Sequence, residues 1–400
     1  YEGQRLMPTT RGWAAIGAAL ALGVLWAAFG EDLLLALAAF LVVAVLGGSF
    51  YVRFATPRLV LGREINPVQL HDGERAIVDL SVRSARRVYR VSVEDRVHGL
   101  GAARFVADRI GTDDVMAGRY EVLCRPRGVY RVGPAKVSLG DPLGFVESTS
   151  TFGTAGRLVV YPKVETLEGV PTGRGQDQTI NTSRAAFWHS GGEDFFTLRE
   201  YHQGDDLRKV HWPSSARRDE LMIKQLEMPW QSRAFIILDP RVEPHGSAES
   251  FEQAVRGAAS TLNHLFRSGY TPTIWAGNGN GTVVGSTDAY RKAMEELATI
   301  RPARDVDLRH LIGRLRRSGM AGGVLVMVTG EADDADLASF QLLSQDFYKT
   351  VVLSVSDGDD DAIMGFARLG ALVVRSTPDG TWSESWRNAM EHGWSTATAG

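Results

Sequence analysis

Residues 191–228 read GGEDFFTLREYHQGDDLRKVHWPSSARRDELMIKQLEM, and this stretch separates two different sequence patterns. It is denser in acids, bases, histidines and aromatics than any other part of the chain. The residues before it predict a membrane anchor and a β-rich spacer, and the residues after it predict one α/β domain. We therefore expect an α+β protein of several domains, as the length of 400 residues also suggests.

The composition narrows the classes of function. A hydrophobic fraction of 44% and a charged fraction of 23% are typical of a folded chain. The net charge of -3 provides no basic field, so we predict no nucleic-acid partner. The single cysteine, Cys124, excludes an internal disulfide and a Cys/His zinc cluster. The sequence begins at Tyr1 rather than Met, so we expect a short N-terminal piece to be missing.

The N-terminal domain, residues 1–56, carries two uncharged apolar runs at about 13–29 and 33–52. Gly30, Glu31 and Asp32 separate the two runs. A helix needs about 20 apolar residues to cross a hydrocarbon core, with about 17 as the lower limit. The two runs therefore predict a transmembrane helical hairpin, with membrane lipid as a partner. The alternatives are a signal peptide for the first run and a buried helical pair.

The charges that flank the two runs predict the orientation of the hairpin. Arg5 and Arg11 precede the first run, and Arg53 and Arg58 follow the second. Because positive residues remain on the inner side, both ends and the C-terminal domains are expected in the cytoplasm. The predicted location is the inner (plasma) membrane.

Residues 57–165 change to an alternating pattern of apolar and polar residues. Turn residues such as His71-Asp72-Gly73 separate the expected strands. Short half-buried strands between turns predict an antiparallel, sandwich-like domain. The expected strands cover residues 76–82, 88–93, 120–123 and 129–137.

Four arginines of this domain leave two interpretations open. Arg83, Arg86, Arg87 and Arg90 follow one another closely in the sequence. Near a membrane they would contact anionic headgroups, and otherwise they form a solvated strand face.

The C-terminal domain, residues 229–400, alternates short apolar strands with amphipathic helices. This order predicts a mainly parallel sheet that is covered on both faces. The strands are expected at 234–238, 273–276, 282–284, 324–328, 350–355 and 372–374. The helices are expected at 250–267, 290–299, 307–316, 335–343, 362–369 and 382–392. Ligands of such sheets bind outside the carboxyl ends of the strands, and Asp239, Thr329 and Ser356 lie at that edge.

The segment 166–228 leaves three interpretations open. The first is a structural ion-pair network in which Arg199 and Arg208 pair with nearby carboxylates, and Trp212 packs beneath it. The second is a partner-docking surface, since Arg, Tyr and Trp are frequent anchors of interfaces. The residues assigned to docking or to the network are Glu193, Asp194, Phe195, Arg199, Tyr201, Gly204, Asp205, Asp206, Arg208, Trp212, Ser215 and Arg217.

The third interpretation is catalysis. His202 or His211 would act as a general base, and Asp205 and Asp206 would hold a metal. The spacing of these residues matches no established metal-ligand motif.

Residues 192–227 closely resemble the signature of the domain of unknown function 58 (DUF58) family. The upstream motifs Arg127-Gly128-Val129-Tyr130, Asp141-Pro142-Leu143-Gly144 and Val160-Tyr161-Pro162 share this resemblance. It implies a membrane-anchored protein with a von Willebrand factor A-like, Rossmann-like C-terminal domain. It also implies an AAA+ ATPase partner of the MoxR type and no established catalytic activity.

The resemblance directs attention to a metal motif, Asp-x-Ser-x-Ser, which begins at the end of the first strand in von Willebrand A domains. Here the sequence is Asp239-Pro240-Arg241-Val242-Glu243, so both serines are replaced. A guanidinium supplies no lone pair and repels a divalent cation. Asp239 and Thr329 therefore remain only a degenerate Mg²⁺ candidate, and no cofactor is predicted. Alternatively, Asp239 caps a turn or pairs with Arg241.

These observations predict a non-enzymatic, membrane-anchored adaptor. It would work with a MoxR-type AAA+ ATPase in the assembly or maturation of an unidentified client protein. One alternative is a metal-dependent hydrolase that uses His202, Asp205, Asp206 and His211. The other is a purely structural envelope protein.

Overall fold

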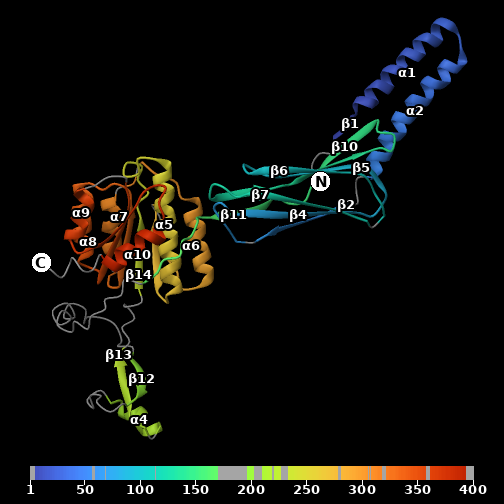
Figure 1. The fold of residues 1–400 in the computed structure, drawn as a ribbon. Coiled ribbons are helices and arrows are strands. Elements are labelled where there is room, and N and C mark those ends of the chain that lie inside the picture. Colours follow the sequence, from blue (N-terminus) through green and yellow to red (C-terminus); the bar gives the residue numbers. More distant parts are fainter. Residues whose placement is uncertain are drawn as a thin grey trace. The chain divides into compact units, whose positions relative to one another are not determined.

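The chain forms two compact units, Tyr1–Pro162 and Lys163–Gly400. The computed structural model describes residues 5–55, 59–67, 69–112, 114–169, 196–201, 210–218, 220–226, 233–277, 281–304, 306, 308–317, 321–356 and 361–392 (Figure 1). The predicted arginine flank at residue 58 lies outside these ranges.

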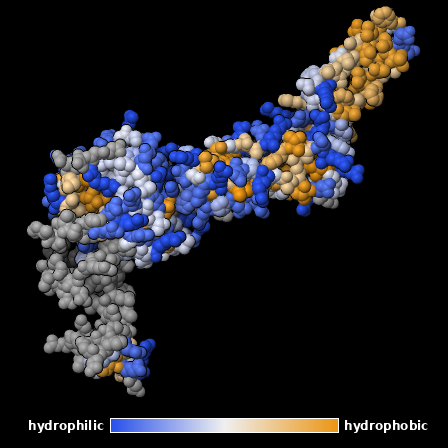
Figure 2. Space-filling model, in the orientation of Figure 1, coloured by the Kyte–Doolittle hydropathy of each residue, from blue (hydrophilic) through white to orange (hydrophobic). Residues whose placement is uncertain are grey.

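Two apolar helices, α1 (Thr10–Phe29) and α2 (Asp32–Ala55), form the predicted hairpin. Thr9 caps the start of α1, and Gly30 ends it in the left-handed conformation with φ of 72°. By length and composition, both helices are able to cross a membrane. Figure 2 shows their continuous apolar surface, with hydrophilic residues at the tip of the hairpin.

The remainder of the first unit contains two sheets. The larger sheet consists of β1 (Arg5–Pro8), β3 (Leu70–His71), β5 (Val88–Val97), β6 (Gly101–Ile110), β8 (Gly128–Val132), β9 (Ala135–Gly140), β10 (Val146–Phe152) and β11 (Gly156–Tyr161). The smaller sheet consists of β2 (Leu59–Asn66), β4 (Arg75–Ser84) and β7 (Val115–Leu123). Val82 of β4, Val93 of β5 and Leu139 of β9 share one buried cluster, so a common core joins the two sheets.

The structure corrects several of the strands that were expected in this unit. The single strand expected over 129–137 is two strands, β8 and β9, because Gly133 makes a turn with φ of 69°. The segment Arg5–Pro8, expected only as a charged flank, is strand β1 and pairs with β10. Strands β2, β3, β6, β10 and β11 were not predicted, and β7 begins at Val115, before the strand expected at 120–123.

A buried ion pair links the two sheets. The guanidinium of Arg63 on β2 donates to the Asp95 carboxylate on β5 through Nη2 and Nε, over 2.6 and 3.1 Å. The Tyr120 hydroxyl of β7 donates to the same carboxylate over 2.8 Å. The Asp95 side chain is 0% exposed and that of Arg63 only 10% exposed, so each charge depends on the other for its stabilisation.

Substitution of Asp95 tests this dependence. We expect Asp95→Ala to lower the free energy of unfolding by about 3–5 kcal/mol, because it leaves Arg63 buried without a carboxylate. The matched control is Asp79→Ala, which removes the exposed Arg119–Asp79 pair of 2.6 Å and is expected to change stability very little. Denaturant unfolding of the detergent-solubilised chain measures both. Equal effects of the two substitutions would contradict the stabilising role of the buried pair.

The second unit is built around a six-stranded sheet with the order β16-β15-β14-β17-β18-β19. Its strands are β14 (Arg233–Leu238), β15 (Thr271–Ala276), β16 (Thr282–Val283), β17 (Val324–Thr329), β18 (Lys349–Val355) and β19 (Leu372–Ser376). All neighbouring strands are parallel except β16, which is antiparallel to β15. Each of the six strands predicted for this domain is present.

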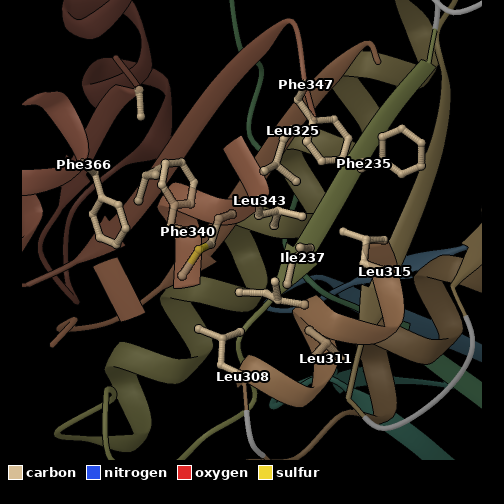
Figure 3. Close-up of a cluster of buried hydrophobic side chains, with 14 of the residues drawn as sticks. Phe235, Ile237, Leu308, Leu311, Leu315, Leu325, Phe340, Leu343, Phe347 and Phe366 are labelled. Atoms are coloured by element: carbon tan, nitrogen blue, oxygen red, sulfur yellow. The ribbon is translucent and has the colours of Figure 1, made fainter. Parts of the chain in front are cut away.

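The helices of this unit are α5 (Ala248–Arg267), α6 (Thr287–Thr299), α7 (Leu308–Arg317), α8 (Asp334–Ser344), α9 (Asp361–Arg368) and α10 (Trp382–His392). Phe235 and Ile237 of β14 contribute to a buried cluster with residues of α7, α8 and α9, among them Leu311, Phe340 and Phe366 (Figure 3). Helix α10 is joined to α5, because the Trp382 indole donates to the Gln253 carbonyl over 2.8 Å. These contacts confirm the predicted alternation of strands and covering helices.

Part of the signature segment forms a strand pair, β12 (Phe196–Glu200) and β13 (Met222–Leu226), which is antiparallel. Helix α4 (Trp212–Arg218) lies between these strands in the sequence. Pro213 is the second residue of α4, and proline has a suitable φ for the first turn of a helix.

Candidate functional site

The carboxyl edge of the parallel sheet carries the best-defined polar cluster of the second unit. Asp239 follows β14 and Thr329 ends β17, and the side chains of both are fully buried. The Thr329 hydroxyl donates to Asp239 Oδ2 over 2.9 Å. β14 lies between β15 and β17, so the strand order reverses its direction at β14. Open α/β sheets bind ligands at such a switch point.

The guanidinium of Arg241 forms ion pairs with two carboxylates of this cluster, those of Asp239 and Asp336. Its Nε and Nη2 donate to Asp239 Oδ1 and Oδ2 over 3.0 and 2.7 Å, and Nη2 also donates to Asp336 Oδ2 over 2.8 Å. Burial opposes the charge, but the hydrogen bonds to the two carboxylates outweigh it and raise the pKa of Arg241 above its usual value. This arrangement confirms Arg241 as the partner of Asp239.

Backbone contacts hold the loop that carries Arg241 against two other segments. The Ala303 N–H donates to the Pro240 carbonyl over 2.7 Å, and the Glu331 N–H donates to the Pro244 carbonyl over 2.7 Å. A Cβ at Gly330 would lie 2.0 Å from the Pro244 oxygen, so only glycine permits this approach. The position of the guanidinium therefore depends on the backbone as well as on the ion pairs.

His245 is a buried residue of the same loop, and it contacts the backbone of Asp239. Its Nε2 lies 3.1 Å from the Asp239 carbonyl oxygen, so the neutral ring donates a proton there. The side chain is buried, and this burial lowers the pKa of His245 below its usual value. We expect the ring to remain neutral at physiological pH.

The residues of this cluster do not fit a divalent cation. The guanidinium already takes both oxygens of Asp239 and one oxygen of Asp336. A cation at that position would face a fixed positive charge whose nitrogens lie only 2.7–3.0 Å from the same carboxylate oxygens. In the described part of the chain, no group of three or more His, Cys, Asp or Glu residues has a metal-binding arrangement.

Sequence reasoning missed Asp336, His245 and Gly330. Asp336 had a detectable signal, because Asp333 and Asp336 form a capping box at the start of α8. The Asp336 N–H donates to Asp333 Oδ1 over 2.7 Å. The carboxylate of Asp336 reaches Arg241 from this cap, 95 residues away in the sequence, a contact that no local pattern indicates.

The signature residues that the structure describes lie on β12, α4 and the segments beside them. Arg199 belongs to β12, and Tyr201 follows it. Ser215 is buried, where its Oγ accepts from the Met222 N–H over 2.9 Å and joins α4 to β13. Arg217 is exposed, and the Trp212 side chain at the start of α4 is 65% exposed.

The other predicted signature residues lie outside the described residues. They are Glu193, Asp194, Phe195, His202, Gly204, Asp205, Asp206 and Arg208. His211 is described, and its Nδ1 lies 2.8 Å from Ser214 Oγ.

The fold and the cluster define a class of protein. Its members would combine two apolar helices, a β-rich unit and an α/β unit with a mainly parallel sheet, and an ion-pair network would fill the carboxyl edge of that sheet. The family model described as "Protein of unknown function DUF58" matches residues 197–369 of this chain. Uncharacterized protein YeaD of Bacillus subtilis (strain 168) is 28% identical over 219 residues, or 52% of this chain. The alignment spans about half of that relative's own length, 53%.

Solved structures show only remote similarity. The CARDB domain of PF1109 from Pyrococcus furiosus aligns with 26% of this chain and 95% of its own, at 15% identity and a TM-score of 0.20. Spo0M, a sporulation control protein from Bacillus subtilis, aligns with 26% of this chain and 49% of its own, at 11% identity and a TM-score of 0.17. Scores this low carry no inference about fold or function.

Removal of the guanidinium tests its place in the site. We expect Arg241→Ala to destabilise the folded chain by about 3–5 kcal/mol, because Asp239 and Asp336 then remain buried without a counter-charge. Millimolar Mg²⁺ should raise the Tm of this variant and leave the Tm of the wild type unchanged, since only the variant exposes two free carboxylates to a cation. Thermal melting with Mg²⁺ and with EDTA measures the effect, and a Mg²⁺-dependent Tm of the wild type would contradict it.

The burial of His245 predicts a loss of stability in acid. Because its pKa is lower in the folded chain than the ordinary value of about 6.5, the unfolded chain binds more protons as the pH falls below that value. This loss of stability is absent at neutral pH. It grows as the pH falls below the ordinary pKa of histidine, and it stops growing once the pH is below the pKa of His245 in the folded chain. Burial also lowers the pKa of His264, which adds an effect of the same sign.

We expect His245→Gln to reduce this pH dependence, because the amide retains an N–H donor for the Asp239 carbonyl and does not titrate. His264→Gln should remove the second contribution in the same way. Tm values across about pH 5–8 provide the measurement. Identical slopes for the wild type and both variants would show that neither histidine is responsible.

Proposed function

We propose that this chain is a membrane-anchored adaptor, whose soluble units bind partner proteins and do not catalyse a reaction. The observation that carries the proposal is the Arg241 network at the carboxyl edge. In an open α/β sheet this edge is the usual place of a ligand or a catalytic group. Here a bidentate ion pair fills it, so the surface that remains for function is the protein exterior.

The strand order supports a von Willebrand factor A-like assignment for the second unit. Numbered from β14 to β19, the strands run 3-2-1-4-5-6 across the sheet, with the third one antiparallel. Asp239 then stands at the first position of the Asp-x-Ser-x-Ser motif, and Arg241 replaces the first serine. In this proposal the guanidinium supplies the positive charge that a metal ion would bring.

The exposure of α4 supports docking rather than internal clamping at the signature segment. A structural network would bury Trp212, yet 65% of this residue is exposed. Arg217 lies on the same short helix and is also exposed. Tryptophan and arginine are the residues most enriched at the centres of protein interfaces, so α4 presents a suitable anchor pair.

The helices support membrane attachment, and the flanking charges support an orientation. Arg5, Arg11 and Arg53 stand at the base of the hairpin, whereas Glu31 and Asp32 stand at its tip. We infer that the base faces the cytoplasm, so that both soluble units are cytoplasmic. The resemblance to DUF58 proteins suggests a MoxR-type AAA+ ATPase as the partner and an unidentified protein as the client.

Co-purification from detergent-solubilised membranes tests this proposal. We expect an AAA+ ATPase to co-purify with the wild type, and Trp212→Ala to weaken the complex by about 2 kcal/mol, roughly thirtyfold in Kd. The control is Leu342→Ala, which truncates a 54%-exposed apolar residue on α8 and should leave binding unchanged. Thermal melting establishes that each variant folds. If no ATPase accompanies the wild type, the proposed partner is wrong, and equal losses in both variants would exclude α4 as the docking site.

A further inference from the structure

The loop between β9 and β10, Asp141–Phe145, is built into the base of the helical hairpin. The Thr9 N–H donates to the Phe145 carbonyl over 2.9 Å, and the Thr9 hydroxyl donates to the Gly144 carbonyl over 2.6 Å. A Cβ at Gly12 of α1 would lie 2.0 Å from the Phe145 oxygen. The first turn of α1 therefore rests directly on the backbone of this loop.

The same loop also contacts α2. A Cβ at Gly48 would lie 3.1 Å from Asp141 Cγ, so the missing side chain allows the loop to approach the helix closely. Gly48 precedes the end of α2 at Ala55 by seven residues, or about 10 Å along the helix. If Arg53 marks the level of the headgroups, the loop lies on the membrane side of that level.

The conformation of the loop is fixed by one carboxylate. Asp141 Oδ2 accepts from the N–H groups of Leu143 and Gly144 over 3.0 Å each, and Oδ1 accepts from the Val146 N–H over 2.7 Å. Asp141 is buried, but Pro142 is exposed and the Leu143 side chain is 56% exposed. The loop thus presents two apolar side chains on a rigid backbone next to the apolar helices.

Three exposed arginines lie around the same junction. The Tyr51 hydroxyl of α2 donates to the Arg87 carbonyl over 2.9 Å, which places Arg86 and Arg87 against the end of that helix. Arg90 lies at a β-bulge with a φ of 49°, unusual for a residue other than glycine. A Cβ at Gly144 would lie 2.6 Å from Arg90 Nη1, so this guanidinium covers the loop.

The charge at this end of the unit favours an anionic partner. Within the described ranges, Arg86, Arg87 and Arg90 have no carboxylate within salt-bridge distance. The acids at the same end are Asp141, which is buried in the loop, and Asp108, Asp114 and Glu147, which the strand register brings there. Arg11 and Arg53 of the helices add two more positive charges, so the arginines outnumber these acids.

We propose that the loop Asp141–Phe145 and Arg86, Arg87 and Arg90 form a binding face for anionic phospholipids. Pro142 and Leu143 enter the boundary between headgroups and acyl chains, and the three guanidinium groups pair with lipid phosphates. The loop of this face contacts Gly12 of α1 and Gly48 of α2, so its occupant is the bilayer in which the hairpin is anchored. The inference rests on the proposed membrane anchoring.

Site-specific fluorescence in proteoliposomes of the full chain tests the face. Leu143→Cys carries an environment-sensitive label, and Leu123→Cys is the matched control, since these leucines are 56% and 55% exposed and Leu123 ends β7 away from the hairpin. Leu25→Cys in α1 reports insertion of the helices. The native Cys124 is buried and takes no label, which the labelled wild type verifies.

We expect doxyl-labelled lipids to quench the labels at positions 25 and 143 but not the label at 123. Phosphatidylglycerol in phosphatidylcholine vesicles should increase the quenching at 143. Arg90→Ala in the Leu143→Cys background should raise the phosphatidylglycerol fraction needed for half of this increase about fivefold, the ratio given by ~1 kcal/mol per arginine. Arg131→Ala, on β8, is the control and should have no effect.

Three outcomes would overturn the proposal. Quenching at 25 with none at 143 would show that the hairpin inserts and the loop remains in water. Quenching at 143 that is equal with and without phosphatidylglycerol would remove the role of the arginines. Absence of quenching at 25 would refute the membrane anchoring itself, and with it the lipid-binding face.

Discussion

The bidentate pair between Arg241 and Asp239, extended to Asp336, is the constraint on which the α/β unit depends at its carboxyl edge. Three charged groups meet there, two from the loop after β14 and one from α8, and their side chains are only 0–16% exposed. Their mutual attraction is strong only because the surroundings are poorly polarisable, and for the same reason the loss of one partner is costly. The backbone hydrogen bonds of Ala303 and Glu331 hold the neighbouring segments against the loop that carries Arg241. Gly330 allows the close approach because it has no side chain.

The first unit also contains a buried arginine–carboxylate pair, and this pair joins two sheets. Arg63 and Asp95 are buried between its sheets and join β2 to β5, while the Tyr120 hydroxyl completes the carboxylate's hydrogen bonds. Neither pair lies on the surface, where screening by water would make it nearly neutral in energy. In both units a buried arginine fork determines how elements that are distant in the sequence come together.

The fold of this chain was largely accessible from its sequence, because apolar periodicity reports burial. The runs at 13–29 and 33–52, and the strands and helices after residue 233, follow patterns that only one kind of element satisfies. Short elements without a regular apolar pattern were not predicted from the sequence. β1 is four residues long and α4 is seven residues long, so both are too short to carry a periodic signal.

The candidate site was accessible only in part. Asp239 and Arg241 are two residues apart, and the misfit of an arginine in a metal motif is visible in the sequence. Asp336 and His245 join them through the crossing of strands and loops, which is a property of the tertiary structure. The docking role proposed for the signature segment remained open for a similar reason, since the exposure of Trp212 is decided by packing and not by residue type.

The junction of β1 and α1 has a mechanical consequence. Thr9 is the only residue between the strand and the helix, and its backbone and hydroxyl are both bonded to the β9–β10 loop. A connection this short has no freedom to rotate. In the proposed membrane anchoring, the angle of the helices to the bilayer normal would therefore determine the angle of the β-rich unit. A change in bilayer thickness that tilts the hairpin would therefore rotate the whole β-rich unit as a lever.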